Sequence, residues 1–398
     1  MSTLPPAQTL ILLFVFLAST AILQGQPWVS GTVLDADDGT PIPFATVYFD
    51  GTTNGQTTDE RGEFKLSLSG MQLPARLIVS HLGYDLAATE VKAPSAGLVF
   101  NMKVQGQDLQ QVEVSDRNLR ERTLAEFRQK LLGDDDWGLA ASIKNEERIV
   151  FNRDYKDVKL VTENPNWRRR LVNSKRYPQT WAEDSSYVVQ EQPLNLRIDR
   201  ATRLRIDLPD IGYDLELDLQ SFLFDYRQAL TSYFGFFFYR PKEGFGEEPR
   251  ARHRRNRERA YYGSSMHFAR SLTTGSLTAN GFAVYRRSGK GPQERIEEIN
   301  LPSYLEPGEA PDTYLLRGLK DENLVILYYG DARGRPLPLK KWKRAKPLES
   351  GIKVVSDSCI VRADGTLPDN ALLFTGQIAT RAGAWLLPSD YHPEEHPE

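Results

Sequence analysis

The sequence predicts a mostly β protein in which a small N-terminal β-sandwich precedes a larger α+β domain. Its 398 residues, 40% hydrophobic and 26% charged, suffice for more than one folded core and exclude wholesale disorder. Residues 27–116 carry short β-branched runs separated by turn pairs, and longer alternating runs with two helical segments follow. The formal charge changes at the same point, from −7 over residues 27–116 to +4 over residues 117–398. We therefore expect a domain boundary near Asp116.

The N-terminus predicts export. Leu10–Leu23 is an uncharged stretch of 14 residues, the length of a signal-peptide core and shorter than the about 20 residues that span a bilayer. We expect a signal peptide over residues 1–26, with a buried N-terminal helix as the alternative. The lone Cys359 lies far from the cleavage point, so neither a lipoprotein anchor nor an intrachain disulfide is expected. The predicted location is the periplasm or the outer membrane, and no transmembrane helix is expected in the mature chain.

Short strands and tight turns alternate in the region 27–116. Asn-Gly and Asp-Gly pairs supply the positive φ that hairpin turns require, and the strand spacing of about 8–12 residues is typical of a sandwich. The strands expected here are Trp28–Leu34, Ala45–Phe49, Glu63–Leu68, Leu77–His81 and Leu98–Met102.

A set of glycines, core residues and turn formers in this region forms a recognisable signature. Its members are Gly31, Gly39, Pro41, Ala45, Gly51, Gly55, Asp59, Gly62 and Phe64, followed by HLGYD at His81–Asp85. This pattern resembles the carboxypeptidase regulatory-like module, a prealbumin/transthyretin-like β-sandwich frequent in exported proteins of the Bacteroidota. The resemblance implies a structural role for these residues and recognition or packing at a β edge, without peptidase activity. In that family the module also precedes outer-membrane receptors, including TonB-dependent ones.

The region 117–387 is expected to form a mixed antiparallel sheet domain with two main helices. Apolar residues at helical spacing predict helices at Leu119–Leu132 and, despite Gly263, at Arg257–Leu272. The run Tyr233–Tyr239 is apolar throughout and predicts a central strand. The other strands expected are Arg148–Asn152, Leu194–Ile198, Arg203–Leu208, Tyr213–Leu219, Asn323–Tyr329, Lys353–Val355, Ser358–Val361 and Leu372–Thr375. This half resembles a region of unassigned function in proteins that carry the module, and residues 388–398 are expected to form a disordered tail.

Motifs that could support catalysis are weak. The tail matches H-x-x-E-H at His392–His396, but Pro393 opposes the helix that a zinc site of this kind needs. Ser264 and His267 lie three residues apart on the second expected helix, a spacing that more often reflects a cap than a nucleophile and its base. No catalytic residue, metal or cofactor is predicted. An enzyme, such as a hydrolase with an unrecognised site in residues 117–398, remains an alternative.

Clustered arginines are the strongest functional feature. The residues expected to bind an anion or a partner are Arg250, Arg252, Arg254, Arg255, Arg257, Arg259, His267 and Arg270. The guanidinium group pairs bidentately with phosphate and carboxylate, so we expect an envelope protein or an anionic glycan or lipid head group as partner. Nucleic acid is not expected in a chain of net charge −3. Further basic clusters lie at Trp167–Arg170 and Lys340–Lys346.

Three interpretations of the whole chain follow. The first is a non-catalytic envelope protein that binds or scaffolds through the sandwich and the basic surface. The second is the enzyme named above. The third is an accessory component of an outer-membrane uptake system of the TonB-dependent type. A merely solvated basic helix would explain the arginines without any of these functions, and the oligomeric state is not predicted.

Overall fold

The structure is a computed structural model that describes residues 27–106, 117–161, 179–181, 187–199, 201–289, 293–368 and 371–393. The chain divides into two compact units, the first reaching Gln105 without the segment Asp50–Thr53, and the second containing that segment and the rest. The predicted signal peptide, the predicted boundary at Asp116 and the basic cluster Trp167–Arg170 lie outside the described residues. Among the helices of the described ranges, none is long and apolar enough to cross a membrane.

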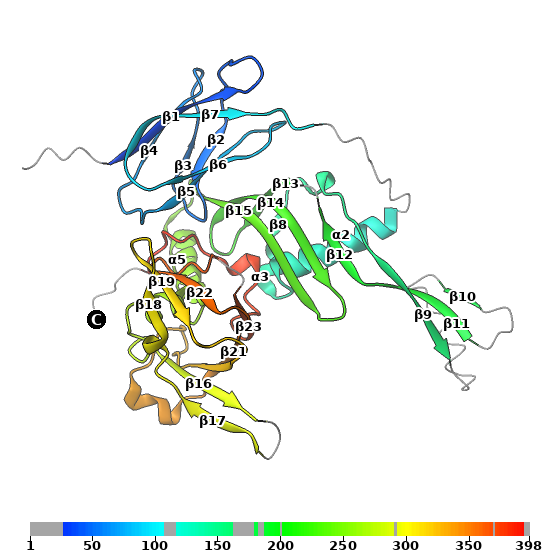
Figure 1. The fold of residues 1–398 in the computed structure, drawn as a ribbon, viewed down its shortest axis with the longest axis vertical. Coiled ribbons are helices and arrows are strands. Elements are labelled where there is room, and N and C mark those ends of the chain that lie inside the picture. Colours follow the sequence, from blue (N-terminus) through cyan, green and yellow to red (C-terminus); the bar gives the residue numbers. More distant parts are fainter. Residues whose placement is uncertain are drawn as a thin grey trace, which may run out of the picture. The chain divides into compact units, whose positions relative to one another are not determined.

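The first unit consists of two sheets packed face to face, which confirms the predicted sandwich (Figure 1). One sheet has the order β4-β1-β7, with β1 antiparallel to β4 and parallel to β7. The other has the order β3-β2-β5-β6. The strands are β1 (Trp28–Asp35), β2 (Thr46–Phe49), β3 (Gly55–Thr57), β4 (Glu63–Ser67), β5 (Ala75–Ser80), β6 (Ala87–Val91) and β7 (Ser95–Met102).

The signature residues of the sandwich fill its core and shape its turns. Phe64 is buried between the sheets, and the hydroxyl of buried Thr58 accepts from the Ala45 amide (2.9 Å) and donates to the Ile42 carbonyl (2.8 Å). Gly62 has a φ of +70°, and a Cβ there would lie 2.5 Å from the Val33 carbonyl oxygen. Only glycine satisfies both constraints, which accounts for its place in the motif.

The second unit contains two cores. The first core lies between α2 (Arg117–Leu132) and a five-stranded sheet in which β14 is central, pairing with β12 and β13 along one edge and with β15 along the other (Figure 1). Phe127 and Leu131 of α2, at the predicted spacing, are buried against it. The strands of this sheet are β8 (Ser142–Ile143), β12 (Asn195–Ile198), β13 (Thr202–Leu208), β14 (Tyr213–Asp225) and β15 (Leu230–Pro241).

Two strand predictions in this part were wrong. The apolar run in β15 is not central: β15 pairs with β14 alone among the described strands, and Phe234 is 52% exposed. Residues 148–152 form no strand, because the short 3₁₀ helix η2 (Glu146–Arg148) precedes a loop. Ile149 and Phe151 of that loop nevertheless point into the core, and burial rather than strand pairing explains their apolar character.

The second core lies between α6 (Ser265–Thr273) and two further sheets. The larger has the order β17-β16-β20-β21-β23 and the smaller β18-β19-β22. Cys359 is fully buried here. The strands are β16 (Phe282–Ser288), β17 (Arg295–Glu298), β18 (Leu305–Pro307), β19 (Thr313–Arg317), β20 (Asn323–Tyr328), β21 (Leu348–Val354), β22 (Ser358–Arg362) and β23 (Leu372–Gly376). The remaining elements of the unit are β9 (Tyr155–Val161), β10 (Gln179–Trp181), β11 (Tyr187–Pro193), α3 (Asp136–Ala140), α5 (Glu247–Tyr261), η4 (Leu301–Tyr304), η5 (Leu339–Arg344) and η6 (Gly383–Trp385).

The single helix predicted over Arg257–Leu272 is wrong, since α5 and α6 are separate helices. Gly263 between them adopts a φ of +73°, which an α-helix cannot contain. A Cβ at this position would lie 2.7 Å from the ring of Tyr328, so the glycine also permits close packing. Ser264 then caps α6 by accepting from the His267 amide (3.1 Å).

The predicted disordered tail is wrong for residues 388–393. Pro388 is buried, the Ser389 amide donates to the Gly51 carbonyl (2.7 Å), and Asp390 accepts hydrogen bonds from Thr53. These contacts give the segment fixed partners within the second unit. Residues 394–398, which contain most of the H-x-x-E-H match, lie outside the described residues.

Candidate functional site

The predicted arginine cluster lies on α5, where helical geometry directs its members to different surroundings. Arg250, Arg252 and Arg255 are exposed. Arg254 and Arg257 line a pocket. Because successive residues of a helix are rotated by about 100°, a continuous run of arginines does not form one continuous surface.

Arg259 belongs to an aromatic cluster. Its guanidinium lies 5.6 Å from the ring centre of Trp137 and 5.3 Å from that of Trp385, and these two indoles stack on each other with centroids 3.7 Å apart. Cations are attracted to the faces of indole rings at such distances. Arg259 therefore supports the packing of η6 on α3, which is a structural role.

Arg257 is held by the loop before β14. Its Nε donates to the Ile211 carbonyl (2.7 Å) and its Nη2 to the Gly212 carbonyl (3.2 Å), while the guanidinium lies 4.0 Å from the ring centre of Tyr213. The guanidinium is thus fixed in position, although these partners are neutral carbonyls and a ring. The carboxylates of β14 are paired elsewhere, for example Glu216 with Arg203 and Arg240.

Arg254 forms an ion pair with Glu247 of the same helix (2.8 Å), in which the Arg254 side chain is 45% and the Glu247 side chain 75% exposed. An exposed ion pair of this kind contributes about 0–1 kcal/mol, because water screens both charges. A ligand anion that reached the Arg254 guanidinium could therefore replace Glu247 at little cost.

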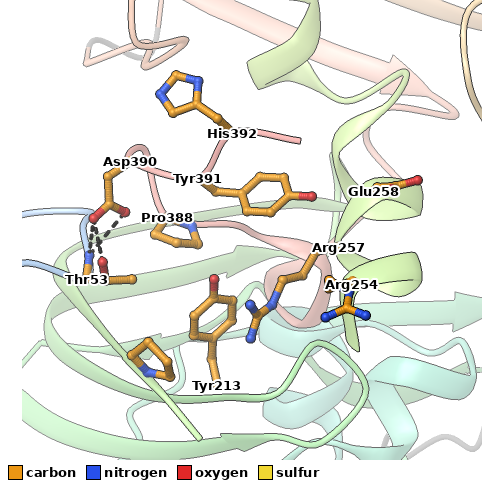
Figure 2. Close-up of a pocket in the computed structure, with 10 residues that line it drawn as sticks. Thr53, Tyr213, Arg254, Arg257, Glu258, Pro388, Asp390, Tyr391 and His392 are labelled. Carbon is orange, nitrogen blue, oxygen red and sulfur yellow. Dashed lines mark hydrogen bonds between the residues drawn. The ribbon is translucent and has the colours of Figure 1, made fainter. Parts of the chain in front are cut away.

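Arg254 and Arg257 border a pocket of about 300 Å³ in the second unit (Figure 2). The phenol of Tyr213 at the start of β14 and that of Tyr391 near the C-terminal end of the described chain line it as well. Figure 2 shows the ring of Tyr391 directed toward α5 and the carboxylate of Asp390 directed toward Thr53. The complete lining is Thr53, Tyr213, Pro241, Arg254, Arg257, Glu258, Pro388, Asp390, Tyr391 and His392.

Both carboxylates of the pocket have partners of their own. Asp390 accepts from the Thr53 amide (2.9 Å) and from the Thr53 hydroxyl. Glu258 is mostly buried and accepts from Arg335 (2.9 Å). The ion pair with Arg335 offsets the negative charge of Glu258, and the two hydrogen bonds from Thr53 hold the Asp390 carboxylate toward Thr53.

The tyrosines remain protonated over the physiological range. Burial raises the pKa of Tyr213, with Arg257 opposing the shift, and burial also raises the pKa of Tyr391. Burial lowers the pKa of His392, which favours its neutral form. The pocket thus offers neutral hydroxyl donors beside guanidinium groups, a combination suited to binding an oxyanion.

Arg270 was predicted to bind a partner, and this is wrong because the side chain is only 9% exposed. It donates to three carbonyls, those of Asp364 (2.8 Å), Ser389 (2.8 Å) and Tyr391 (2.9 Å). Arg270 therefore positions the C-terminal segment that forms one wall of the pocket.

His267 was also predicted to bind a partner, and it is buried among aromatic rings at 2% exposure. Its Nδ1 accepts from the Gly263 amide (3.1 Å), so the neutral ring carries its proton on Nε2. Burial is the main cause that lowers the pKa of His267 to about 4. This histidine stabilises the break between α5 and α6 and cannot contact a partner in the folded protein.

Tyr213, Asp390, Tyr391 and Thr53 were not predicted as site residues. They come from separate segments of the chain and share no spacing pattern, so sequence motifs could not have assembled them. The described residues contain no group of three His, Cys, Asp or Glu side chains that could hold a metal ion.

Comparison with known proteins identifies the sandwich. Residues 29–114 match the model of the CarboxypepD_reg-like domain family, so the N-terminal unit is a domain of this class. More particularly, TonB-dependent receptor P39 of Formosa agariphila is 33% identical to this chain over 105 residues. The matched part is 26% of this chain and 10% of the receptor, so the chain spans only about a tenth of that relative. The predicted resemblance of the N-terminal module is confirmed.

Proposed function

We propose that this protein is an exported component of the bacterial envelope that binds an anionic group of a partner in the pocket beside α5. The observation that carries this proposal is the convergence of Arg254, Arg257, Tyr213 and Tyr391 on one cavity. The CarboxypepD_reg-like domain and the similarity to a TonB-dependent receptor fit an envelope-associated role.

The size of the pocket limits what it can bind. A volume of about 300 Å³ lies at the lower end of small-molecule sites, so it suits one carboxylate- or phosphate-bearing group rather than a length of polymer. Such a group can belong to an acidic side chain of an envelope protein or to an acidic sugar. We infer binding rather than chemistry, because guanidinium and phenol groups recognise an oxyanion through hydrogen bonds without forming a covalent bond to it.

Isothermal titration with glucuronate and inorganic phosphate, with glucose as the uncharged probe, tests the anion site. We expect at least one of the two anions to bind and Arg254→Gln to weaken its binding at least fivefold, because a charge-assisted hydrogen bond is lost. Arg252→Gln is the matched control, since it removes the same charge from an exposed position outside the pocket. Absence of binding by both anions, or equal losses in the two variants, would contradict the proposal.

Export is tested separately from binding. We expect the chain, produced in cells of the organism, to be found in the envelope fraction and to start near Gln26 or Pro27 on N-terminal sequencing. An intact Met1 in the cytoplasmic fraction would show that the segment Leu10–Leu23 is not a signal peptide.

A role as an accessory of outer-membrane uptake is the second candidate, and the similarity to TonB-dependent receptor P39 favours it. Photo-crosslinking from Phe44, which is 68% exposed on the sandwich, tests this role in intact envelopes. We expect a crosslinked product that contains an outer-membrane receptor. If the same products form from an exposed position of the second unit, such as Arg227, the sandwich has no specific role in the contact.

A further inference from the structure

A second basic surface lies outside the pocket, on and next to η5. Residues 332–348 contain seven Lys or Arg residues and no acidic residue. We define the basic segment as Leu339–Lys346, whose five cations are all exposed: Lys340, Lys341, Lys343, Arg344 and Lys346. None of these five forms an ion pair with any residue within the described ranges. This contrasts with Arg254 and Arg257 of α5, whose guanidinium groups have partners.

The basic segment is fixed to the fold through its tryptophan. The indole of Trp342 stacks on Tyr329, with centroids 4.2 Å apart and planes 7° from parallel, and its Nε1 donates to the Leu337 carbonyl (2.8 Å). The cations are therefore presented on an anchored backbone. Anchoring lowers the conformational entropy that the segment would lose on binding.

The 3₁₀ geometry arranges the side chains of η5 by type. With three residues per turn, residues i and i+3 lie on the same side of the helix. Lys340 aligns with Lys343 and Lys341 with Arg344, while Leu339 aligns with Trp342. Leu339 is 60% exposed, so an apolar side chain accompanies the cations at the surface.

We propose that the basic segment binds an anionic lipid surface, with its cations on the phosphate head groups and Leu339 at the acyl boundary. Clusters of four to eight Lys and Arg residues bind anionic membranes through electrostatic attraction. The exposed leucine favours a lipid surface over soluble phosphate, because only a lipid surface offers an apolar layer next to its charges. Lysine predominates in the segment and, as a point charge, accepts head groups in many orientations.

Co-sedimentation with vesicles of phosphatidylglycerol and phosphatidylcholine, against vesicles of phosphatidylcholine alone, tests this inference on the full chain. We expect binding only to the anionic vesicles and its loss at 0.5 M salt. Each cation near an anionic surface contributes about fivefold to the affinity. The triple variant Lys340→Gln, Lys341→Gln, Lys343→Gln should therefore bind at least tenfold more weakly.

A triple variant with the same charge change elsewhere in the second unit is the matched control. Lys156→Gln, Arg227→Gln and Lys353→Gln remove three exposed cations of that unit and should leave binding within twofold of the wild type. All three proteins share the N-terminal apolar segment, so its contribution cancels, and equal melting temperatures would show that the variants are folded.

Four outcomes would overturn the inference. They are no binding to anionic vesicles, equal binding to neutral vesicles, equal weakening in both triple variants, and competition by inorganic phosphate at concentrations that leave ionic strength unchanged. The last would assign the segment to a soluble anion. Leu339→Ser separates the apolar contribution, and we expect it to weaken binding to vesicles severalfold without changing the salt dependence.

Discussion

His267 is expected to make the stability of the second unit depend on pH. Its ring is 2% exposed and packs against Tyr261, Tyr262, Phe282 and Tyr328, with centroid distances between 4.9 and 5.8 Å. Burial lowers its pKa from 6.5 to about 4; the charges of Arg270 and Arg381 add to this shift and a hydrogen bond with Asn280 opposes it. Protonation would also place a proton on Nδ1, where the Gly263 amide donates.

The direction of the effect follows from proton binding. Between pH 6.5 and pH 4 the unfolded chain binds the proton and the folded protein does not, so the free energy of unfolding decreases as the pH falls through this window. For a pKa of 6.5 unfolded and about 4 folded, the contribution of His267 decreases by about 2 kcal/mol from pH 7 to pH 4.5. Below pH 4 the loss levels off at about 3 kcal/mol.

His267→Gln removes the titration while keeping an amide oxygen that can accept from Gly263. We expect the variant to be less stable than the wild type at pH 7 by about 1–3 kcal/mol, because ring packing is lost. The difference should shrink by about 2 kcal/mol at pH 4.5, since only the wild type pays the protonation penalty. Urea unfolding from pH 7 to pH 4.5, followed by tryptophan fluorescence, measures it.

The comparison between variants isolates His267 from the carboxylates, which titrate in every protein of the series. His392→Gln removes a histidine whose pKa burial also lowers but whose side chain is exposed, so its curve should differ from that of the wild type less than the curve of His267→Gln does. Parallel stability curves for the wild type and His267→Gln would refute the reasoning, because they would show that the buried ring is not held neutral.

Three further predictions test the packing, the second with a control substitution. Arg270→Lys should lower the free energy of unfolding by about 2–3 kcal/mol in denaturant, since a lysine cannot donate to three carbonyls in one plane. The variant should also expose the C-terminal segment to carboxypeptidase. Unchanged proteolysis would contradict the positioning role of Arg270. Gly62→Ala should lower the free energy of unfolding by about 2–4 kcal/mol, because the new Cβ would strike the Val33 carbonyl. Gly39→Ala is the control, since Gly39 has a similar φ and open space around it, and should lower the free energy of unfolding by about 1 kcal/mol. Equal losses in the two variants would refute the steric argument. Thr58→Val should lower the free energy of unfolding, measured by thermal unfolding, by about 1–3 kcal/mol, because the Ala45 amide and the Ile42 carbonyl lose their hydrogen-bond partner. No change in stability would show that water replaces the hydroxyl.

The sequence predicted the fold best where local pattern and tertiary structure agree. The alternation of Tyr213–Leu219 continues through β14, and the helical spacing of Leu124, Phe127 and Leu131 places all three in the core with α2. The predictions failed where the apolar residues of a segment have a cause other than the structural position that they suggested. The apolar run of β15 reflects burial of both faces at Phe238 and Tyr239, while its edge position depends on which strands pair, a long-range property.

Short elements were missed for a different reason. β3, with sequence GQT, has no apolar alternation, and it forms because the β2 hairpin returns the chain beside it. An isolated glycine costs only about 1 kcal/mol within a helix, so Gly263 by itself does not exclude one. A Cβ at position 263 would strike the Tyr328 ring, a contact 65 residues away in sequence that no local pattern contains.

The arginines show why charge in a sequence does not define a charged surface. Arg257 and Arg270 donate to backbone carbonyls, and Arg259 lies over a tryptophan pair, so all three guanidinium groups contact other parts of the protein. Arginine suits such positions because its planar group can bond several carbonyls or stack on a ring. The five cations of the segment Leu339–Lys346, four lysines and Arg344, lie at the surface instead. The two basic clusters therefore differ in their surroundings: Arg254 and Arg257 of α5 line a pocket, whereas all the cations next to Trp342 face solvent, where an extended anionic surface can reach them.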